Sequence, residues 1–514
     1  MQLLIDIGLF LIYCGLTTLL IAWAWKFWML NANQIFEKGL KWAVLEIKLP
    51  REINKSPEAA ELFLRSMIEG GGLGTWYKEK WLGNIPNTAA LEIASIEGVV
   101  RFYIRIETKY RPRIEAAIYS QYPNVEIVEV PDYMDKIPKI VHNDPEMPAT
   151  WSSEWVLTKS GDAKVPNKAG DNIDELKYSG DMYPIKTYKD WGLDKDPKEM
   201  FKHDPLTYVI EQLGAIGKGE YLVFQIIIRD SGKWNEVYEI ERNKKKDSVK
   251  VKLSDLVKFE IDKYKIKSSL KEKGKSIGTD DTGMPKMKPV PTGKKDADGK
   301  PIMEDKEIVY AKNIVELKPI PPNERDDDAK KNLELIQRKI GKPQVFAIIR
   351  TTYVADSYSN IGTRIPMVMG LMRPFSEDGF NSFRPDVDGS LTDPYDFPWQ
   401  NTMKRLVPWR KENAYGDLAD RGGMFSFLGG MGKPAKKKLD IIFFNYPPHF
   451  KKIYSVMHNV FLHPFKPTMN LSVGMTLNIE ELATLFHFPG EVAATPSLPR
   501  IDSTKSSSPS NLPM

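Results

Sequence analysis

The chain has 514 residues, more than one ordinary domain, and a hydrophobic content of 42%, which excludes global disorder. Its formal net charge of +5 at pH 7 excludes a histone-like polycation. The single cysteine, Cys14, excludes a disulfide framework and a zinc or iron–sulfur site with cysteine ligands. A globular protein of several domains is predicted.

The first predicted element is a transmembrane helix within residues 1–30. Ile7–Trp25 is a run of 19 residues without a charge, and such a helix spans roughly 28 Å, close to the thickness of the hydrocarbon core. A cleaved signal peptide is the alternative, although no Lys or Arg precedes the run. Basic residues follow the run, which predicts a single-pass protein of the cell (inner) membrane with its N-terminus outside and its body cytoplasmic. These residues are Lys26, Lys38, Lys41, Lys48 and Arg51.

After a juxtamembrane segment (31–41), residues 42–131 are predicted to form a first ferredoxin-like unit. Apolar residues alternate in the predicted strands, and Ser56-Pro57 is typical of a helix start. The order of elements is β-α-β-β-α-β, the split βαβ arrangement. The elements are Trp42–Leu49, a helix from Ser56, Leu91–Ile96, Val99–Glu107, a helix at about 112–122 and Val125–Val130.

A linker at 132–182 and a second, weaker copy of the unit at 183–445 are predicted next, the latter with insertions at 231–325 and 376–437. The alternative is a set of unrelated α+β segments. The expected elements are Pro184–Tyr188, a helix from Asp204-Pro205 to about Ile216, Tyr221–Arg229, Gln344–Val354, a helix at Tyr358–Met372 and a strand at Leu439–Phe444. The predicted fold class is therefore α+β, an N-terminal transmembrane helix followed by tandem ferredoxin-like units with long insertions.

The C-terminal part is predicted to contain a packing segment (446–490) and a disordered tail (491–514). Asn478 with Glu481 three residues later forms a capping-box pattern, which predicts the start of a short helix. The tail is rich in Pro and Ser and lacks periodicity, so we expect it to be extended and mobile when it is alone.

Positive charge is concentrated in residues 242–275, which carry 13 basic and 5 acidic side chains, a net charge of 13 − 5 = +8. Apolar residues at helical spacing beside four lysines favour a basic amphipathic helix that contacts an anionic membrane or a nucleic acid. The alternative is a solvated excursion that ends in a disordered loop. The lysines are Lys258, Lys263, Lys265 and Lys267.

A second candidate surface lies on the predicted strand Val99–Glu107. Strand alternation places Arg101, Tyr103 and Arg105 on the face away from the helices, where RNA-recognition folds carry stacking aromatic residues. The full RNA-recognition motif is missing from the strand. Coverage of this face by another domain or subunit is therefore the alternative interpretation.

Motifs for catalysis are missing from the sequence. It has no G-x-x-x-x-G-K-[ST] loop, no H-E-x-x-H pair and no G-x-S-x-G elbow. His449, His458 and His463 lie in aromatic, Pro-rich sequence, which favours ordinary packing histidines over a metal site. We therefore predict no catalytic residue, no cofactor, no metal and no enzymatic activity.

Two N-terminal stretches, LEIKLPREINKSPEAAELFLRSM and LEIASIEGVVRFYIRIETKYRPRIEAAIYSQYPNVEIVEV, resemble an uncharacterised membrane-anchored domain family of candidate-phyla bacteria. In that family the domain commonly precedes, or is encoded beside, a HerA/TraD-like ATPase of the type IV secretion and conjugation class. The stretch NIEELATLFHFPGEVAATPSLPRIDSTKSSSPSNLP resembles the segment that leads into the ATPase in fused members. The chain ends at Met514, where an ATPase domain would begin in those members.

The resemblance implies a membrane-anchored accessory or scaffold subunit that positions a separate ATPase in a type IV secretion or conjugation-like translocation system. The partners would be the lipid bilayer and that ATPase, and the residues Thr495–Pro513 would dock on the ATPase or tether it. One alternative is a membrane-tethered nucleic-acid-binding protein. Another is an enzyme whose site carries no recognised motif.

Overall fold

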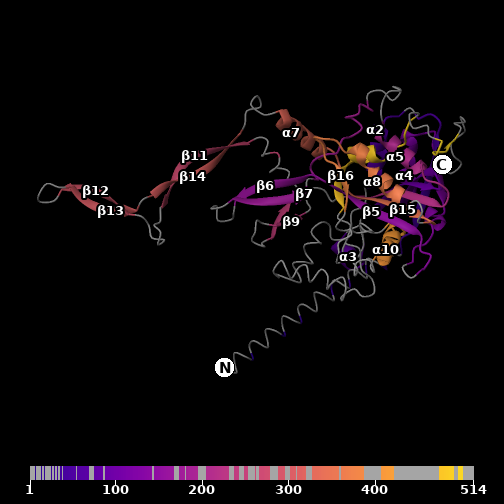
Figure 1. The fold of residues 1–514 in the computed structure, drawn as a ribbon, viewed down its shortest axis with the longest axis horizontal. Coiled ribbons are helices and arrows are strands. Elements are labelled where there is room, and N and C mark those ends of the chain that lie inside the picture. Colours follow the sequence, from indigo (N-terminus) through magenta and orange to yellow (C-terminus); the bar gives the residue numbers. More distant parts are fainter. Residues whose placement is uncertain are drawn as a thin grey trace. The chain divides into compact units, whose positions relative to one another are not determined.

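A computed structural model shows two compact units in this chain, Met1–Asp255 with Leu335–Met514, and Leu256–Glu334 (Figure 1). The structure also describes Ile261 and isolated positions before residue 41. Otherwise it describes residues 41–53, 55–68, 75–84, 87–141, 144–166, 173–179, 181–194, 204–230, 237–241, 248–252, 266–277, 287–295, 301–307, 309–319, 327–357, 361–386, 407–421, 474–490 and 496–501.

The larger unit is built on a ten-stranded sheet with the order β16-β5-β15-β8-β2-β3-β1. Strands β4 and β18 both pair with β1, and β17 pairs with β15. Every pair is antiparallel except β1 with β18. The strands are β1 (Trp42–Pro50), β2 (Thr88–Ile96), β3 (Val99–Glu107), β4 (Glu126–Val130), β5 (Ala149–Leu157), β8 (Glu220–Asp230), β15 (Gln344–Ala355), β16 (Phe383–Pro385), β17 (Met475–Asn478) and β18 (Arg500–Ile501).

The same strand order occurs twice in this sheet. In one half, the elements β1-α2-β2-β3-α4-β4 are arranged β4-β1-β3-β2. In the other half, β5-α5-β8-β15-α8-β16 are arranged β16-β5-β15-β8, again the order of the split βαβ arrangement. Strands β2 and β8 pair with each other and join the two halves into one sheet. The helices are α2 (Glu58–Ile68), α4 (Arg111–Gln121), α5 (Pro205–Gly214) and α8 (Ile361–Gly370).

Two strands of the second half differ from the prediction. The predicted first strand, 184–188, contains only an isolated bridge from Ile185 to Asn381, and the first strand is instead β5, inside the predicted linker. The strand β5 was missed because Ser153, between Trp151 and Trp155, interrupts the apolar series of its sequence, ATWSSEWVL. The fourth strand is β16, whereas Leu439–Phe444 lies outside the described residues.

The structure also overturns the predicted membrane topology. Across the part of the chain that is described, no helix combines the length and the apolar character that crossing a bilayer requires. Most of Ile7–Trp25 lies outside the described residues. Freedom from charge is necessary for a membrane span, but it does not by itself establish a continuous helix of sufficient length. The transmembrane helix, the single-pass topology and the inner-membrane location are therefore withdrawn, and the fold class is α+β with a large antiparallel sheet.

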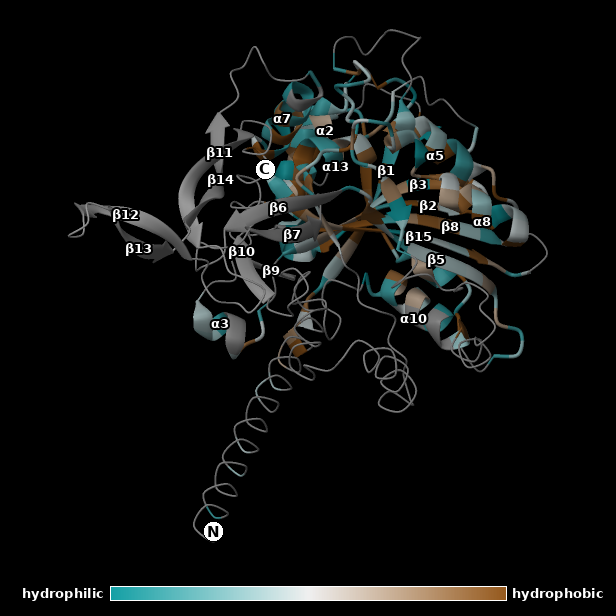
Figure 2. Ribbon diagram, turned by 60° about the vertical axis from the view of Figure 1, so that its left-hand side comes forward, coloured by the Kyte–Doolittle hydropathy of each residue, from teal (hydrophilic) through white to brown (hydrophobic). Residues whose placement is uncertain are grey.

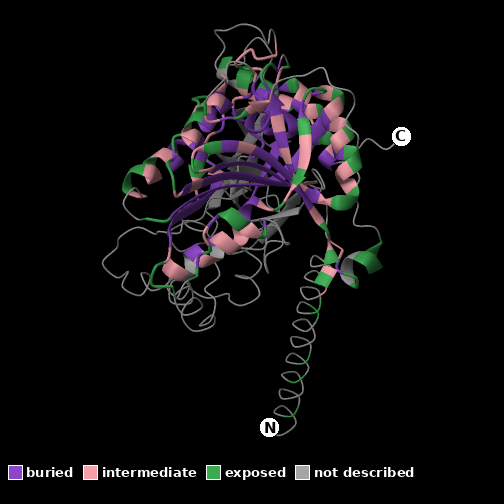
Figure 3. Ribbon diagram, turned by 90° about the vertical axis from the view of Figure 1, so that its right-hand side faces the viewer, coloured by how far each residue is buried: buried purple, intermediate pink, exposed green. Residues whose placement is uncertain are grey.

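One face of the sheet carries the main hydrophobic core, beneath the helices. Figure 2 shows α5 and α8 beside the strands of the sheet, and Figure 3 shows that the strands of the sheet are mostly buried. On β3, the residues Val100, Phe102, Ile104 and Ile106 are buried here, which confirms the predicted alternation. Phe488 stacks on Phe63 with their ring centroids 5.5 Å apart. Burial of each such ring stabilises the fold by about 1.5–3 kcal/mol.

The other face is covered by helix α10 (Val407–Ala419) and by a segment that begins with the 3₁₀ helix η2 (Tyr133–Lys136). Leu418 of α10 packs against Val223 and Val354, and Tyr133 packs against the sheet beside them. This cover makes the sheet a buried middle layer between two sets of elements.

The C-terminal segment is part of the core. Helix α13 (Ile479–Leu485) is entirely buried, and the capping box is confirmed, because Asn478 and Glu481 each accept a hydrogen bond from the backbone N–H of the other (2.8 and 2.7 Å). The predicted disordered tail is wrong for residues 496–501, since Leu498 is buried and β18 pairs with β1. The unpaired edge of β1 supplies hydrogen-bond partners that composition does not reveal. Residues 502–514 lie outside the described part.

The remaining elements are short or form two-stranded ribbons. The predicted basic helix lies almost wholly outside the described residues, as do Lys258, Lys263 and Lys265, whereas Lys267 lies in β11. The larger unit has β6 (Ser160–Pro166) with β7 (Ile173–Ser179), β9 (Val237–Glu241) with β10 (Ser248–Lys252), α3 (Trp76–Lys80), η1 (Thr108–Tyr110) and η6 (Arg373–Phe375). The smaller unit has β11 (Ile266–Ile277) with β14 (Val309–Pro319) and β12 (Met287–Lys295) with β13 (Pro301–Glu307). Helix α7 (Asp327–Ile340) begins in the smaller unit and ends in the larger one.

Candidate functional site

The predicted face of β3 does lie opposite the helices, but the chain itself covers its aromatic residue. Tyr103 is 2% exposed and stacks on Tyr133, with the ring centroids 4.8 Å apart. Burial raises the pKa of Tyr103. Arg101 is paired with Glu46 (Nε–Oε1, 3.3 Å). A buried tyrosine offers no surface for base stacking, so the cover is neither a nucleic acid nor another subunit.

Arg105, the third predicted residue of this face, lies at its edge. Its guanidinium is 4.1 Å from the ring centroid of Trp42, in cation–π geometry. Together with Asp420 and Arg421, these two residues line a small surface pocket. Arg105 therefore makes a cation–π contact with Trp42 at the edge of the face that α10 covers.

A row of buried polar residues crosses four neighbouring strands on the same face. Glu154 (β5), Arg350 (β15), Gln225 (β8) and Glu92 (β2) are consecutive register partners, and we call them the polar row. Arg350 donates to Glu154 Oε1 (2.6 Å) and to Gln225 Oε1 (2.9 Å). Gln225 in turn donates to Glu92 Oε1 (2.8 Å). The row therefore connects the two halves of the sheet by side-chain hydrogen bonds.

The polar row also holds helix α10 and the residues that follow it. Arg350 donates to the carbonyl oxygen of Asp417 (2.8 Å), and Gln225 donates to that of Leu418 (3.2 Å). Arg421 donates to both oxygens of Glu92 (2.9 and 3.1 Å) and also binds Asp132. Burial alone would lower the pKa of Arg421, but the nearby acidic groups raise it well above its ordinary value.

The negative charge of Asp417 lowers the stability of the folded state. Burial raises its pKa to about 6 from the ordinary value of 3.8, Arg350 opposes the shift, and Glu154 and Asp420 add to it. A raised folded-state pKa stabilises the fold at low pH, and this stabilisation is lost as the pH rises through 6.

Replacement of Asp417 by asparagine is therefore expected to raise the free energy of unfolding at pH 8. The gain should be roughly 2–3 kcal/mol, because one pKa unit corresponds to about 1.4 kcal/mol, and it should vanish below pH 4. Urea denaturation from pH 3.5 to 8 measures it. The exposed Asp378 provides the control, since Asp378→Asn should change stability by less than about 0.5 kcal/mol at either pH. A gain that is equal at pH 3.5 and pH 8 contradicts the prediction.

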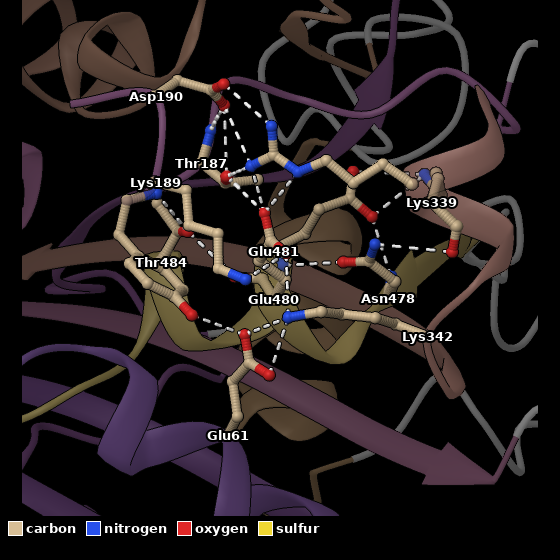
Figure 4. Close-up of polar contacts among 12 residues, drawn as sticks. Glu61, Thr187, Lys189, Asp190, Lys339, Lys342, Asn478, Glu480, Glu481 and Thr484 are labelled. Atoms are coloured by element: carbon tan, nitrogen blue, oxygen red, sulfur yellow. Dashed lines mark hydrogen bonds and ion pairs between the residues drawn. The ribbon is translucent and has the colours of Figure 1, made fainter. Parts of the chain in front are cut away.

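A second buried network surrounds the start of α13, and we call it the C-terminal lock (Figure 4). Glu480, 1% exposed, accepts hydrogen bonds from Arg338 Nε (2.8 Å) and Thr187 Oγ1 (2.6 Å). Lys342 Nζ lies 2.8 Å from Glu480 Oε2 and 2.6 Å from Glu61 Oε1 of α2. The network therefore ties the C-terminal segment to α2, to the turn at 187–190 and to the end of α7.

Two carboxyls of the C-terminal lock respond differently to burial. For Glu480 burial raises the pKa, but Arg338, Lys342 and Thr187 outweigh it and lower the pKa to about 2. For Glu481 burial dominates and raises the pKa, although Lys339 Nζ lies 3.1 Å from its Oε2. Glu480 is therefore held as a carboxylate by its cations. Glu481 additionally serves as the capping-box residue of α13.

The two networks contain none of the site residues that the sequence predicted, and they bring together residues that the sequence did not indicate. Lys267 belongs to strand β11 of the smaller unit, whereas the predicted face on β3 belongs to the larger unit. The capping-box spacing identified Glu481, whereas no local signal pointed to Arg338, Arg350 or Arg421. Among the residues that the structure describes, no group of three or more His, Cys, Asp or Glu side chains is placed to hold a metal ion.

No family model, no curated protein and no solved structure matches this chain.

Proposed function

We propose that the protein is a non-catalytic accessory or scaffold subunit of a type IV secretion or conjugation-like translocation system, in which it positions a separate HerA/TraD-like ATPase. The proposal rests on the resemblance of residues 45–67, 91–130 and 478–513 to the ATPase-associated domain family. The observation that carries it is the C-terminal lock, which fixes to the body the segment that leads into the ATPase in fused members.

The C-terminal lock supports a positioning role because it restricts the motion of the C-terminal segment relative to the body of the protein. Glu480 is bound by Arg338 and Lys342, and beyond it β18 pairs with β1. Partners attached to the body through a rigid segment lose less orientational freedom on assembly than partners attached through a flexible one. The intramolecular packing of residues 496–501 leaves residues 502–513 as the docking segment, with a reach of at most about 40 Å.

Co-purification with a HerA/TraD-like ATPase from the same genome tests this proposal. Tagged full-length protein is expected to recover the ATPase, and a chain truncated after Ile501 should recover at least tenfold less. This truncation keeps every residue that the structure describes in the C-terminal segment, so its unfolding transition should match that of the full chain. Failure of the full chain to recover the ATPase would overturn the function, and equal recovery by both chains would overturn the docking segment.

A further inference from the structure

The smaller unit contains a long two-stranded ribbon formed by β11 and β14. Ten register pairs join the strands, from Ile266–Pro319 to Ile277–Val309, with one bulge between Glu272 and Lys275. The ribbon carries six lysines and two glutamates, a net charge of 6 − 2 = +4. Isolated two-stranded ribbons are marginally stable in water, so a ribbon of this length gains from a ligand along one face.

Strand alternation places four of the six lysines on one face of the ribbon, together with Ile314 and Tyr310, and most of the apolar residues on the other face. Four lysines fall on one face, which we call the lysine face, with Glu316 as the acidic residue among the ribbon positions of that face. The opposite face holds Lys275, Glu272 and the apolar residues Ile266, Leu270, Val315 and Leu317. The lysine face consists of Lys267 and Lys271 of β11 and Lys312 and Lys318 of β14.

The register places lysine directly opposite lysine. Lys267 is the partner of Lys318, and in the second hairpin Lys288 is the partner of Lys306. Like charges in directly opposed positions destabilise an antiparallel pair. A polyanion along the ribbon would neutralise both lysines of such a pair, so the feature that weakens the free ribbon favours its bound form.

We propose that the lysine face binds the phosphate backbone of duplex DNA without sequence preference. Along one strand of the ribbon, Lys267 and Lys271 are four residues apart, about 13 Å, which matches phosphates about four nucleotides apart in a backbone that rises about 3.4 Å per nucleotide. A two-stranded β-ribbon also fits the width of the major groove. Four lysines supply phosphate contacts, which position a protein on DNA but do not read its sequence.

Fluorescence anisotropy with the full-length protein and a 20-base-pair duplex of arbitrary sequence tests the proposal. Four phosphate contacts predict a slope of log K against log salt near −3.6, so that affinity should fall about a hundredfold between 50 and 200 mM salt. The quadruple variant with Gln at positions 267, 271, 312 and 318 should lose at least tenfold at 50 mM salt. Lys275→Gln, on the same strand but the opposite face, is the matched control and should change affinity less than twofold.

A single variant separates binding from ribbon stability. Lys318→Glu places an opposite charge across from Lys267, which should strengthen the ribbon while it weakens DNA binding at least tenfold. Protection of the ribbon from limited proteolysis checks the first effect. The proposal is overturned if binding at 50 mM salt is absent or independent of salt, or if the quadruple variant binds like the parent. Unchanged binding by Lys318→Glu, or retention by anionic phosphatidylglycerol vesicles without retention by the duplex, also overturns it.

Discussion

Replacement of Glu480 by alanine is expected to lower the free energy of unfolding by about 2–4 kcal/mol, because it removes the buried carboxylate that two partly buried cations share. Arg338 and Lys342 both bind this carboxylate, and Thr187 donates to it. Urea denaturation at pH 7, followed by circular dichroism, measures the loss. An effect of this size would unfold a marginally stable protein.

The control for Glu480 is an exposed ion pair in the same sheet. Lys48 and Glu126 are 2.8 Å apart with side-chain exposures of 38% and 50%, so Glu126→Ala should cost less than about 1 kcal/mol. The effect of Glu480→Ala should also depend on pH. Since the folded pKa of Glu480 lies near 2, below its ordinary 4.5, its stabilisation is present above pH 4.5 and is lost as the pH falls towards 2. Similar losses for the two variants would contradict the assignment.

Replacement of Arg421 by methionine is expected to destabilise the fold by about 3–5 kcal/mol. Its guanidinium is the partner of the fully buried Glu92 and also binds Asp132, so its removal leaves a buried carboxylate uncompensated. Loss of this contact should also weaken the attachment of α10, because Arg421 lies two residues after the end of that helix. Urea denaturation gives the stability, and hydrogen exchange of the α10 amides reports the attachment.

A double variant distinguishes the charge effect from a loss of packing. Glu92→Gln combined with Arg421→Met removes the uncompensated carboxylate, so the double variant should be more stable than Arg421→Met alone. The partly exposed pair of Arg101 with Glu46 is the control, and Arg101→Met should cost less than about 1 kcal/mol. Additive losses from Glu92→Gln and Arg421→Met would show that the two residues do not interact energetically.

Local sequence patterns were sufficient to predict the elements in which apolar and polar residues recur at regular spacing. Alternation located β3 and its buried residues, and the spacing of Asn478 and Glu481 located the start of α13. Strand β5 was missed because Ser153 interrupts its apolar face, whereas Glu154 of the polar row lies on the other face. Its hydrogen bonds with β15, rather than its own composition, make it a strand of the sheet.

The buried networks were beyond prediction from the sequence because their partners are distant along the chain. Arg421 and Glu92 are 329 residues apart, and Arg338 and Glu480 are 142 residues apart. An isolated arginine in a sequence gives no sign of whether it faces water or a buried carboxylate. The membrane prediction failed for a related reason, since an uncharged run fixes composition but not the three-dimensional element that contains it.

The positions of β17 and β18 also determine when the fold can be completed during synthesis. Strand β17 pairs with the start of β15, and β18 pairs with the end of β1, so the last described segments close against both halves of the sheet. A growing chain on the ribosome therefore exposes the apolar surface meant for α13 until residues 474–501 have emerged. Pairing of β1 with a strand 450 residues later also implies slow final closure and a need for protection from aggregation until then.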